Sequence, residues 1–114
     1  MTTIYHNPRC SKSRQTLALL EEKGIQTQVR LYQKDLLSKK ELDQLIIQLG
    51  IQPLDLMRTK EAAYKELGLN KDSSDEERIQ AMLDNPSLIE RPIVVHNGKA
   101  KLGRPPENVL ELFS

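Results

Sequence analysis

A strand and a helix are predicted to meet within the segment TTIYHNPRCSKSR, residues 2–14. Residues Thr2–His6 are β-branched and aromatic, which favours a short strand, and Asn7-Pro8-Arg9 interrupts it. Apolar residues then recur at helical spacing within a polar frame. The residues that mark this helix are Leu17, Leu19 and Leu20 in its apolar stripe, Ser11 as the predicted N-cap and Gly24 as its predicted end. Cys10 therefore lies at the strand–helix junction.

A second strand is predicted over Gln26–Tyr32, where apolar and polar residues alternate loosely. A helix between two strands forms a βαβ unit, and such a unit favours parallel pairing of its strands. The first third of the chain thus predicts part of an α/β sheet.

The middle of the chain, about residues 38–89, is predicted to be helical. Its helix signals are a capping box at Ser38–Glu41, overlapping capping boxes within Ser73–Glu77, two glycine stops and two prolines that begin or end a turn. They predict a helix from Ser38 to Gly50, a short one from Pro53 to Met57, a piece over Glu61–Leu67 before Gly68, and a helix from Ser73–Glu77 through Leu83, ended by Asn85-Pro86.

The last part of the chain predicts a hairpin and a final helix. Pro92–His96 is the most strand-like stretch, and Asn97-Gly98 after it is a strong hairpin signal before a partner strand over Lys99–Gly103. A helix is predicted to begin at Pro105-Pro106-Glu107. The order βαβ…ββα predicts an α/β fold with a four-stranded mixed sheet. We expect one domain over residues 1–114, with a helical insertion at about 38–89.

Composition narrows the classes of function. The 114 residues hold 17 Lys+Arg against 16 Asp+Glu, and a net charge of +1 argues against a general nucleic-acid binder. No apolar stretch approaches the roughly 20 residues of a membrane span, and the N-terminus MTTIYHNPRC lacks the pattern of a signal peptide. One cysteine permits neither an internal disulfide nor a cysteine-rich metal site. We expect a soluble cytoplasmic protein that binds no metal.

Cys10 has two interpretations. A thiol at a helix N-terminus faces unpaired N–H groups and the positive end of the helix dipole, which lowers its pKa. Most free cysteines are instead buried structural residues. The polar flanks, His-Asn-Pro-Arg on one side and Ser-Lys-Ser-Arg on the other, are unlike a core segment. Position alone leaves both interpretations open.

The spacing around Cys10 separates thiol chemistries. Cys10-Ser11-Lys12-Ser13 has no second cysteine, so a self-contained dithiol oxidoreductase is excluded. Cys10 to Arg14 is C-x-x-x-R, shorter than the C-x-x-x-x-x-R loop of cysteine phosphatases. Any thiol redox cycle must therefore take its second thiol from another molecule.

Three arginines occupy junctions between predicted elements: Arg58, Arg91 and Arg104. Guanidinium groups suit tetrahedral oxyanions because they donate paired hydrogen bonds of fixed geometry. Each arginine alone could equally be a solvated surface residue, and spacing does not show that they converge. His6, at a strand end, is as consistent with a structural hydrogen bond as with a role beside the thiol.

Taken together, these motifs resemble the glutaredoxin-dependent arsenate reductase family (ArsC-like). The resemblance spans essentially the whole chain. It is carried by Tyr5-His6-Asn7-Pro8-x-Cys10, Ser13-Arg14, Tyr64-x-x-Leu67-Gly68-Leu69, Arg91-Pro92-Ile93-Val94, Arg104-Pro105 and the Arg58 region. It implies a thioredoxin-like fold with a helical insertion and a cis peptide bond between Arg91 and Pro92.

The resemblance also implies roles for individual residues. Cys10 matches the nucleophile, His6 a histidine placed to lower its pKa, and Ser13 a serine near the thiolate. Arg58, Arg91 and Arg104 match the arginines that bind the oxyanion. The implied reaction reduces arsenate to arsenite, with glutathione as co-substrate, glutaredoxin as partner and no bound cofactor. We expect a monomer without nucleic-acid or membrane partners.

The chain departs from the family pattern beside the cysteine, where Ser11-Lys12 replaces the usual Gly-Thr pair. Lys12 adds a cation there, so the substrate could be a related oxyanion and the activity that of another thiol reductase. A second class of function is a regulator similar to Spx proteins, which bind RNA polymerase, although Ser13 replaces the second cysteine of their redox switch. A third class of function is a purely structural interaction module, in which Cys10 is unreactive.

Overall fold

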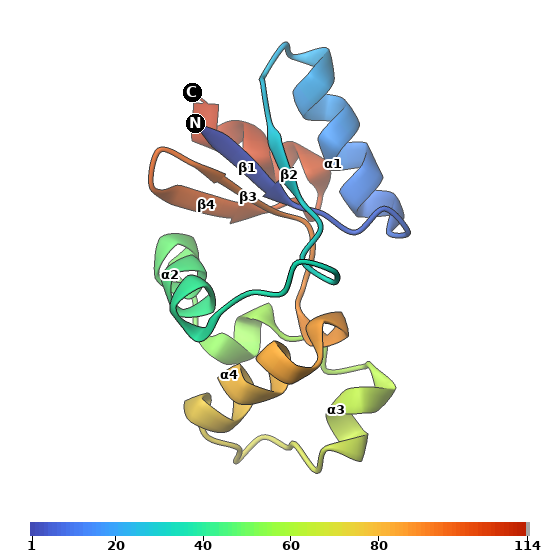
Figure 1. Ribbon diagram of the computed structural model, residues 1–114, viewed down its shortest axis with the longest axis vertical. Helices are drawn as coiled ribbons and strands as arrows, with labels where there is room; N and C mark the ends of the chain where they lie inside the picture. Colours follow the sequence, from blue (N-terminus) through green and yellow to red (C-terminus); the bar gives the residue numbers. More distant parts are fainter. Residues whose placement is uncertain (114) are drawn as a thin grey trace. The chain divides into compact units, whose positions relative to one another are not determined.

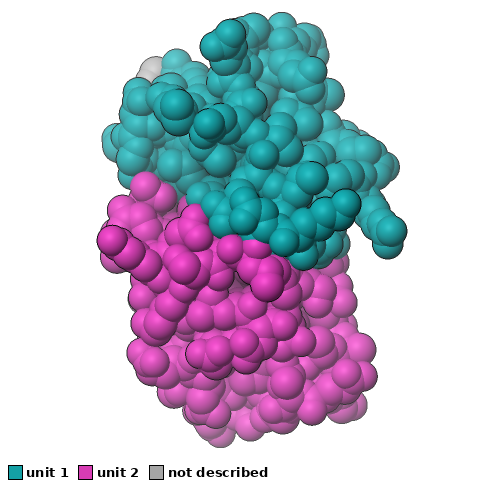
Figure 2. Space-filling view, in the orientation of Figure 1, with its two compact units in different colours: residues 1–35, 91–114 teal, residues 36–90 magenta. Residues whose placement is uncertain are grey.

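The computed structural model describes residues 1–113, which fall into two compact units (Figure 2). The sheet unit comprises residues 1–35 and the chain from residue 91 onward, and the helical unit comprises residues 36–90. The helical unit differs by only a few residues from the insertion predicted at about 38–89. Whether the chain behaves as one domain stays a prediction.

The sheet unit contains a four-stranded mixed sheet in the order β2-β1-β3-β4 (Figure 1). The strands are β1 (Thr2–Tyr5), β2 (Gln28–Arg30), β3 (Ile93–His96) and β4 (Lys99–Leu102). β1 pairs in parallel with β2 and antiparallel with β3, and β3 pairs antiparallel with β4. The predicted α/β class, the mixed sheet and the parallel βαβ unit are confirmed.

β2 is shorter than predicted, three residues instead of Gln26–Tyr32. It is an edge strand, so it forms a ladder with β1 alone, and Val29 at its centre is exposed. Beyond Arg30 the chain turns, because the N–H of Asp35 donates to the carbonyl of Leu31 at 2.8 Å. The apolar residues that suggested a longer strand therefore lie outside the ladder.

The core of the sheet unit is aliphatic. Ile4 of β1, Leu20 of α1 (Ser11–Glu22), Val94 of β3 and Val109 are fully buried together. Val109 belongs to the 3₁₀-helix η3 (Pro106–Phe113), which packs on α1, β3 and β4. The final helix thus forms where it was predicted, but in 3₁₀ form, with the N–H of Asn108 bonded to the carbonyl of Pro105.

The predicted hairpin between β3 and β4 is confirmed. Asn97 has φ 49° and Gly98 has φ 81°. These left-handed conformations are those that a two-residue hairpin turn with Asn-Gly requires. The turn fixes the register in which Ile93 faces Leu102.

The helical unit contains short helices around a small apolar core. Its elements are α2 (Lys39–Leu49), η1 (Pro53–Leu56), α3 (Ala62–Glu66), α4 (Asp75–Asp84) and η2 (Pro86–Leu88). The predicted capping box at Ser38 forms, and of the overlapping boxes the one at Ser74 forms, with each hydroxyl accepting the N–H three residues on. α4 packs against α2, η1 and η2. Within the described residues, no helix combines the length and apolar character needed to cross a membrane.

Candidate functional site

Cys10 is the N-cap residue of α1, with φ −95° and ψ 123°, and Ser11 is the first helical residue. The prediction of Ser11 as the N-cap is therefore wrong by one position. A thiol is a weaker hydrogen-bond acceptor than the hydroxyls and carboxylates that usually cap helices. The Cys10 sulfur lies beside N–H groups of the first turn that have no partner within the helix.

The surroundings of Cys10 lower the pKa of its thiol. Burial alone raises this pKa because it disfavours the charged thiolate. That effect is outweighed by a hydrogen bond from the N–H of Ser13, by the hydrogen bond and charge of Arg91, and by the N–H of Lys12. The groups that stabilise the thiolate thus come from the first turn of α1 and from Arg91, two residues before β3.

Arg104 is a second guanidinium beside the sulfur. Its Nη2 lies 3.9 Å from Cys10 Sγ, and its Nε donates to the carbonyl oxygen of Arg91 at 2.9 Å. Within the described chain, Arg91 Nε is buried without a hydrogen-bond partner. The structure therefore brings Cys10, Arg91 and Arg104 together, as the sequence could not show.

Two peptide bonds in this region are cis. The Arg91-Pro92 bond is cis, which confirms what the family resemblance implied. The Arg104-Pro105 bond is also cis, and the sequence analysis did not foresee it. Each of the two arginines beside Cys10 thus directly precedes a cis-proline.

His6 and Ser13 form a buried pair behind the cysteine loop. His6 Nδ1 lies 2.6 Å from Ser13 Oγ, which also accepts the N–H of Asn7 at 3.0 Å. Burial, and then the positive charge of Arg14, lower the pKa of His6. The direct partner of the imidazole is thus the Ser13 hydroxyl, while the Ser13 backbone N–H serves the Cys10 sulfur.

Asn7 is a site residue whose importance the sequence analysis missed. It is buried, its carbonyl accepts the N–H of Cys10 at 3.0 Å, and its side-chain oxygen accepts the N–H of Arg9 at 3.0 Å. An asparagine that bonds the backbone two residues ahead forms an Asx turn. The signal was the Asn7-Pro8 pair, which predicted the end of a strand and formed part of the family motif but assigned no role to Asn7 in the site.

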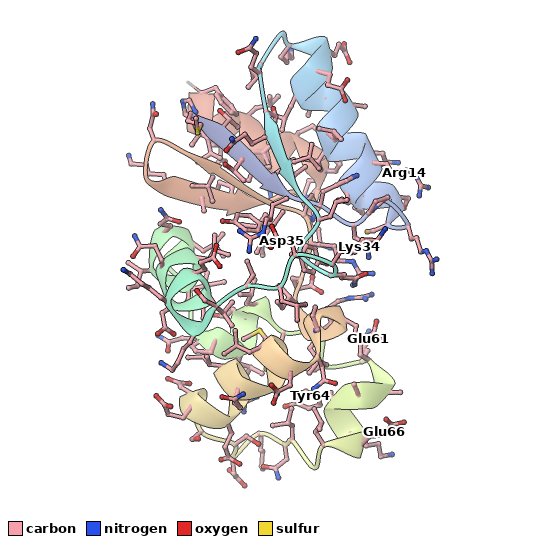
Figure 3. The ribbon with its side chains drawn as sticks, viewed as in Figure 1. Arg14, Lys34, Asp35, Glu61, Tyr64 and Glu66 are labelled. Atoms are coloured by element: carbon pink, nitrogen blue, oxygen red, sulfur yellow. The ribbon has the colours of Figure 1, made fainter. Side chains whose placement is uncertain are left out.

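Arg58 belongs to the helical unit, where two carboxylates hold its guanidinium. Nη1 pairs with Glu61 Oε1, and Nε lies 3.3 Å from Glu90 Oε1. Figure 3 labels Glu61 near α3, together with Tyr64 and Glu66. The predicted oxyanion ligand Arg58 is therefore engaged in ion pairs within its own unit.

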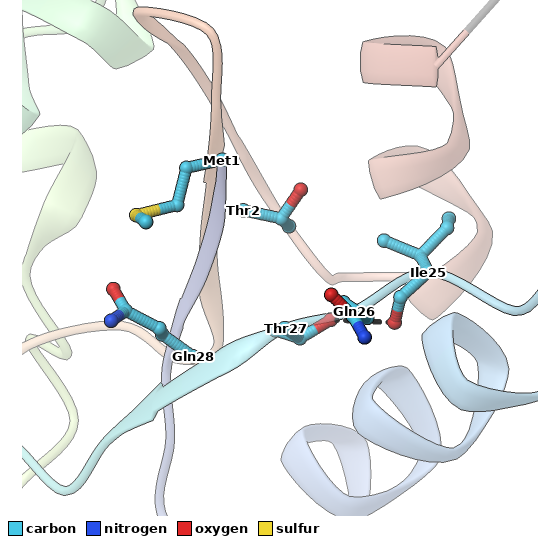
Figure 4. A pocket seen from close by; sticks show the side chains of 6 residues that line it. All are labelled: Met1, Thr2, Ile25, Gln26, Thr27 and Gln28. Carbon is cyan, nitrogen blue, oxygen red and sulfur yellow. Dashed lines mark hydrogen bonds between the residues drawn. The ribbon is translucent and has the colours of Figure 1, made fainter.

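A surface pocket of the sheet unit lies apart from Cys10. It is lined by Met1, Thr2, Ile25, Gln26, Thr27 and Gln28 (Figure 4). Thr2 begins β1, whereas Cys10 follows the other end of that strand. The lining has no charged side chain.

Comparison with known proteins gives consistent matches over nearly the whole chain. A model of the ArsC family matches residues 5–112. "Uncharacterized protein YfgD" of Escherichia coli is 57% identical over 96% of this chain and 93% of its own length. The "Arsenate reductase" of Haemophilus influenzae is 53% identical over 96% of this chain and 97% of its own. The solved "Arsenate reductase from Vibrio cholerae" has a TM-score of 0.94 and 54% identity, covering 97% of this chain and 96% of that one.

Proposed function

Because the chain belongs to the ArsC family and has its thioredoxin-like fold, we propose that it is an arsenate reductase that uses Cys10 as nucleophile and takes electrons from glutathione and glutaredoxin. One observation supports this most directly. The Cys10 sulfur lies at the start of α1 among two backbone N–H groups and two guanidinium groups, so that it is poised as a thiolate next to donors for an oxyanion.

Arsenate binding would use the donors that surround the sulfur. Arg91 Nε is a buried donor without a partner in the described chain, and an arsenate oxygen would supply the missing acceptor. Arg104 adds a second guanidinium, and guanidinium–oxyanion bonds are charge-assisted and directional. Arg58 is proposed as a third ligand, which requires that its guanidinium exchange a carboxylate of the helical unit for the substrate.

The first chemical step is attack of the Cys10 thiolate on arsenic. An S–As bond forms, one arsenate oxygen leaves as water after protonation, and arsenic stays at the +5 level. The sulfur of glutathione then attacks the Cys10 sulfur. The S–As bond breaks and its electron pair stays on arsenic, which leaves as arsenite, while Cys10 and glutathione form a mixed disulfide.

Release of this mixed disulfide needs another thiol, because the chain holds no second cysteine. We assign that step to glutaredoxin, whose thiol would attack the glutathione sulfur and return the Cys10 thiolate. Glutathione is thus a co-substrate, and the protein carries no bound cofactor of its own. The proposed setting is the cytoplasm, where thiols are kept reduced, and the proposed working form is a monomer.

His6 and Ser13 are proposed to support the nucleophile. Ser13 presents its backbone N–H to the sulfur, and its hydroxyl binds both His6 and the Asn7 N–H. These bonds fix the first turn of α1 in the position that the thiolate needs. His6 therefore acts on Cys10 through Ser13.

The test is a coupled assay of arsenite formation with glutathione and glutaredoxin. We expect turnover that disappears when either thiol partner is omitted and in the Cys10→Ser variant. Phosphate and other oxyanions are compared side by side, because Lys12 adds a cation that the family pattern lacks. If wild-type turnover equals that of Cys10→Ser, the arsenate assignment is wrong.

A further inference from the structure

We propose that Gly103 and Thr16 are positioning residues of the Cys10 site, and that their close contact fixes the strand bearing Arg91 and Arg104 against the first turn of α1. The inference deepens the proposed function, on which it rests for its meaning in catalysis. Its physical content, the placement of two guanidinium groups beside a thiol, is testable without any turnover.

Gly103 occupies a position where no side chain fits. It is buried, and a Cβ placed on it would lie 2.5 Å from Thr16 Oγ1 and 2.7 Å from Pro92 Cγ. Contacts this short are far inside van der Waals separation. The backbone at residue 103 therefore touches α1 on one side and the cis-proline that follows Arg91 on the other.

Thr16 connects this contact to the nucleophile. It is fully buried, and its hydroxyl donates to the carbonyl oxygen of Lys12 at 2.8 Å. The N–H of Lys12 is one of the groups that lower the pKa of Cys10. A shift of the Thr16 side chain is thus transmitted to the turn that binds the sulfur.

Gly103 is equally tied to the strand side of the site. Its N–H donates to the carbonyl of Pro92 at 3.0 Å, and the next residue, Arg104, donates from Nε to the carbonyl of Arg91 at 2.9 Å. The first bond continues the β3–β4 backbone pairing by one residue beyond the pair Ile93 and Leu102, and the second joins the Arg104 side chain to the backbone of Arg91. Gly103 therefore holds Arg91 and Arg104 in register with each other.

The four other glycines differ from Gly103 in the constraint that excludes a side chain. Gly24, Gly50, Gly68 and Gly98 have positive φ angles and open space where a Cβ would lie. Gly103 has no such backbone requirement, and its constraint is the neighbouring side chains. The close approach of Thr16 and Pro92 thus distinguishes Gly103 from the four other glycines.

The experiment measures the pKa of Cys10 in Gly103→Ala by the pH dependence of iodoacetamide alkylation, and the protection from alkylation that sulfate gives. Because the added methyl group must push the strand and α1 apart, we expect the Cys10 pKa to rise and the thiolate fraction at a given pH to fall. Sulfate should protect about tenfold more weakly, equivalent to about 1.4 kcal/mol. A wild-type pKa together with wild-type protection would overturn the inference.

Two further variants separate positioning from loss of stability. Gly98→Ala strains the hairpin turn at φ 81°, in open space, so it should lower stability and leave the Cys10 pKa unchanged. Thr16→Ala removes the nearest clashing atom, so Gly103→Ala should raise the Cys10 pKa less in a Thr16→Ala background than in the wild-type background. An equal rise in the two backgrounds would also contradict the inference.

If Gly103→Ala does not fold, Thr16→Val tests the same contact. It puts a methyl group near the place of the hydroxyl and removes the bond to Lys12, so the Cys10 pKa should still rise. An unchanged pKa in that variant counts against the inference. Failure of the proposed function is a separate result, since a wild-type protein without arsenite formation still has a Cys10 pKa to compare.

Discussion

His6 Nδ1 and Ser13 Oγ lie 2.6 Å apart, and both side chains are buried. The Ser13 oxygen already accepts the Asn7 N–H, so its own proton is available to donate to the imidazole. That arrangement suits a neutral His6 with its proton on Nε2, since imidazolium has no acceptor nitrogen. The buried pair thus couples a titratable group to the helix turn that binds Cys10.

The first prediction concerns the titration of His6. Burial and the charge of Arg14 lower its pKa, so its NMR titration midpoint should lie below about 6.5, the ordinary histidine value. At a pH between the His6 pKa of the folded chain and that of the unfolded chain, the unfolded chain binds a proton that the folded chain does not. The free energy of unfolding should therefore be unaffected by this group above about pH 6.5 and fall as the pH drops through the window below it.

The control for that prediction is His6→Asn, whose side-chain oxygen can still accept from Ser13 but does not titrate. Urea unfolding at pH 7.5 and at pH 5.5 is measured for both proteins. The loss of stability on acidification should be smaller in the variant, because the carboxylates contribute equally to both. Equal losses would show that His6 does not carry the effect.

The second prediction concerns Arg91. The alkylation of Cys10 should be half-maximal at a lower pH than for an ordinary thiol, because hydrogen bonds and the Arg91 charge lower the pKa of Cys10. Arg91→Ala should move that midpoint upward. Arg14→Ala removes a nearby charge whose guanidinium instead donates to the carbonyl of Pro8, and its shift should be smaller. A larger shift in Arg14→Ala would refute this ranking.

The third prediction tests whether Glu61 competes with an oxyanion for Arg58. Glu61→Gln frees the Nη1 group that Glu61 now binds, so sulfate binding measured by calorimetry should tighten. Partly exposed ion pairs are worth about 0–1 kcal/mol, which limits the gain to about fivefold. Glu66→Gln removes the same charge at the other end of α3, which Glu61 directly precedes, and should change affinity less. Equal affinities in the two variants would argue against Arg58 as a ligand.

The fourth prediction concerns the interior of the helical unit. Arg78 is only 3% exposed, and its guanidinium donates to Tyr64 Oη at 3.1 Å and to the carbonyl of Asn70 at 2.8 Å. Tyr64→Phe removes one acceptor from a buried charge. Hydrogen bonds to charged groups contribute about 1.5–3 kcal/mol, so the free energy of unfolding in urea should fall by about that amount. An unchanged unfolding midpoint would mean that water replaces the hydroxyl without cost.

The elements that the sequence predicted well are those encoded over a few residues. The Ser38 and Ser74 capping boxes and the Asn97-Gly98 turn each use contacts within four positions. β2 was predicted too long because its end is set by pairing with β1 and not by its own residues. Local chemistry thus accounts for most helix starts and for the hairpin.

The site depends on contacts across the sheet, and the sequence could not supply them. Arg104 reaches Cys10 because the β3–β4 register brings residue 104 beside residue 91. The ion pairs of Arg58 and the tight packing around Gly103 are likewise invisible in the spacing of residues. The junctions between predicted elements singled out these arginines, and only the family resemblance implied that they act together.

Because Cys10 is the one thiol of the chain and is half-buried, the covalent intermediates of the proposed reaction can be identified from the mass of the protein. Every covalent state of the proposed cycle is a mass added at Cys10, because no other sulfhydryl exists to share or hide it. Intact-chain mass spectrometry of a quenched sample would therefore resolve free enzyme from glutathione adduct in one spectrum. The order and lifetimes of the intermediates can therefore be measured without labels and without mutating other cysteines.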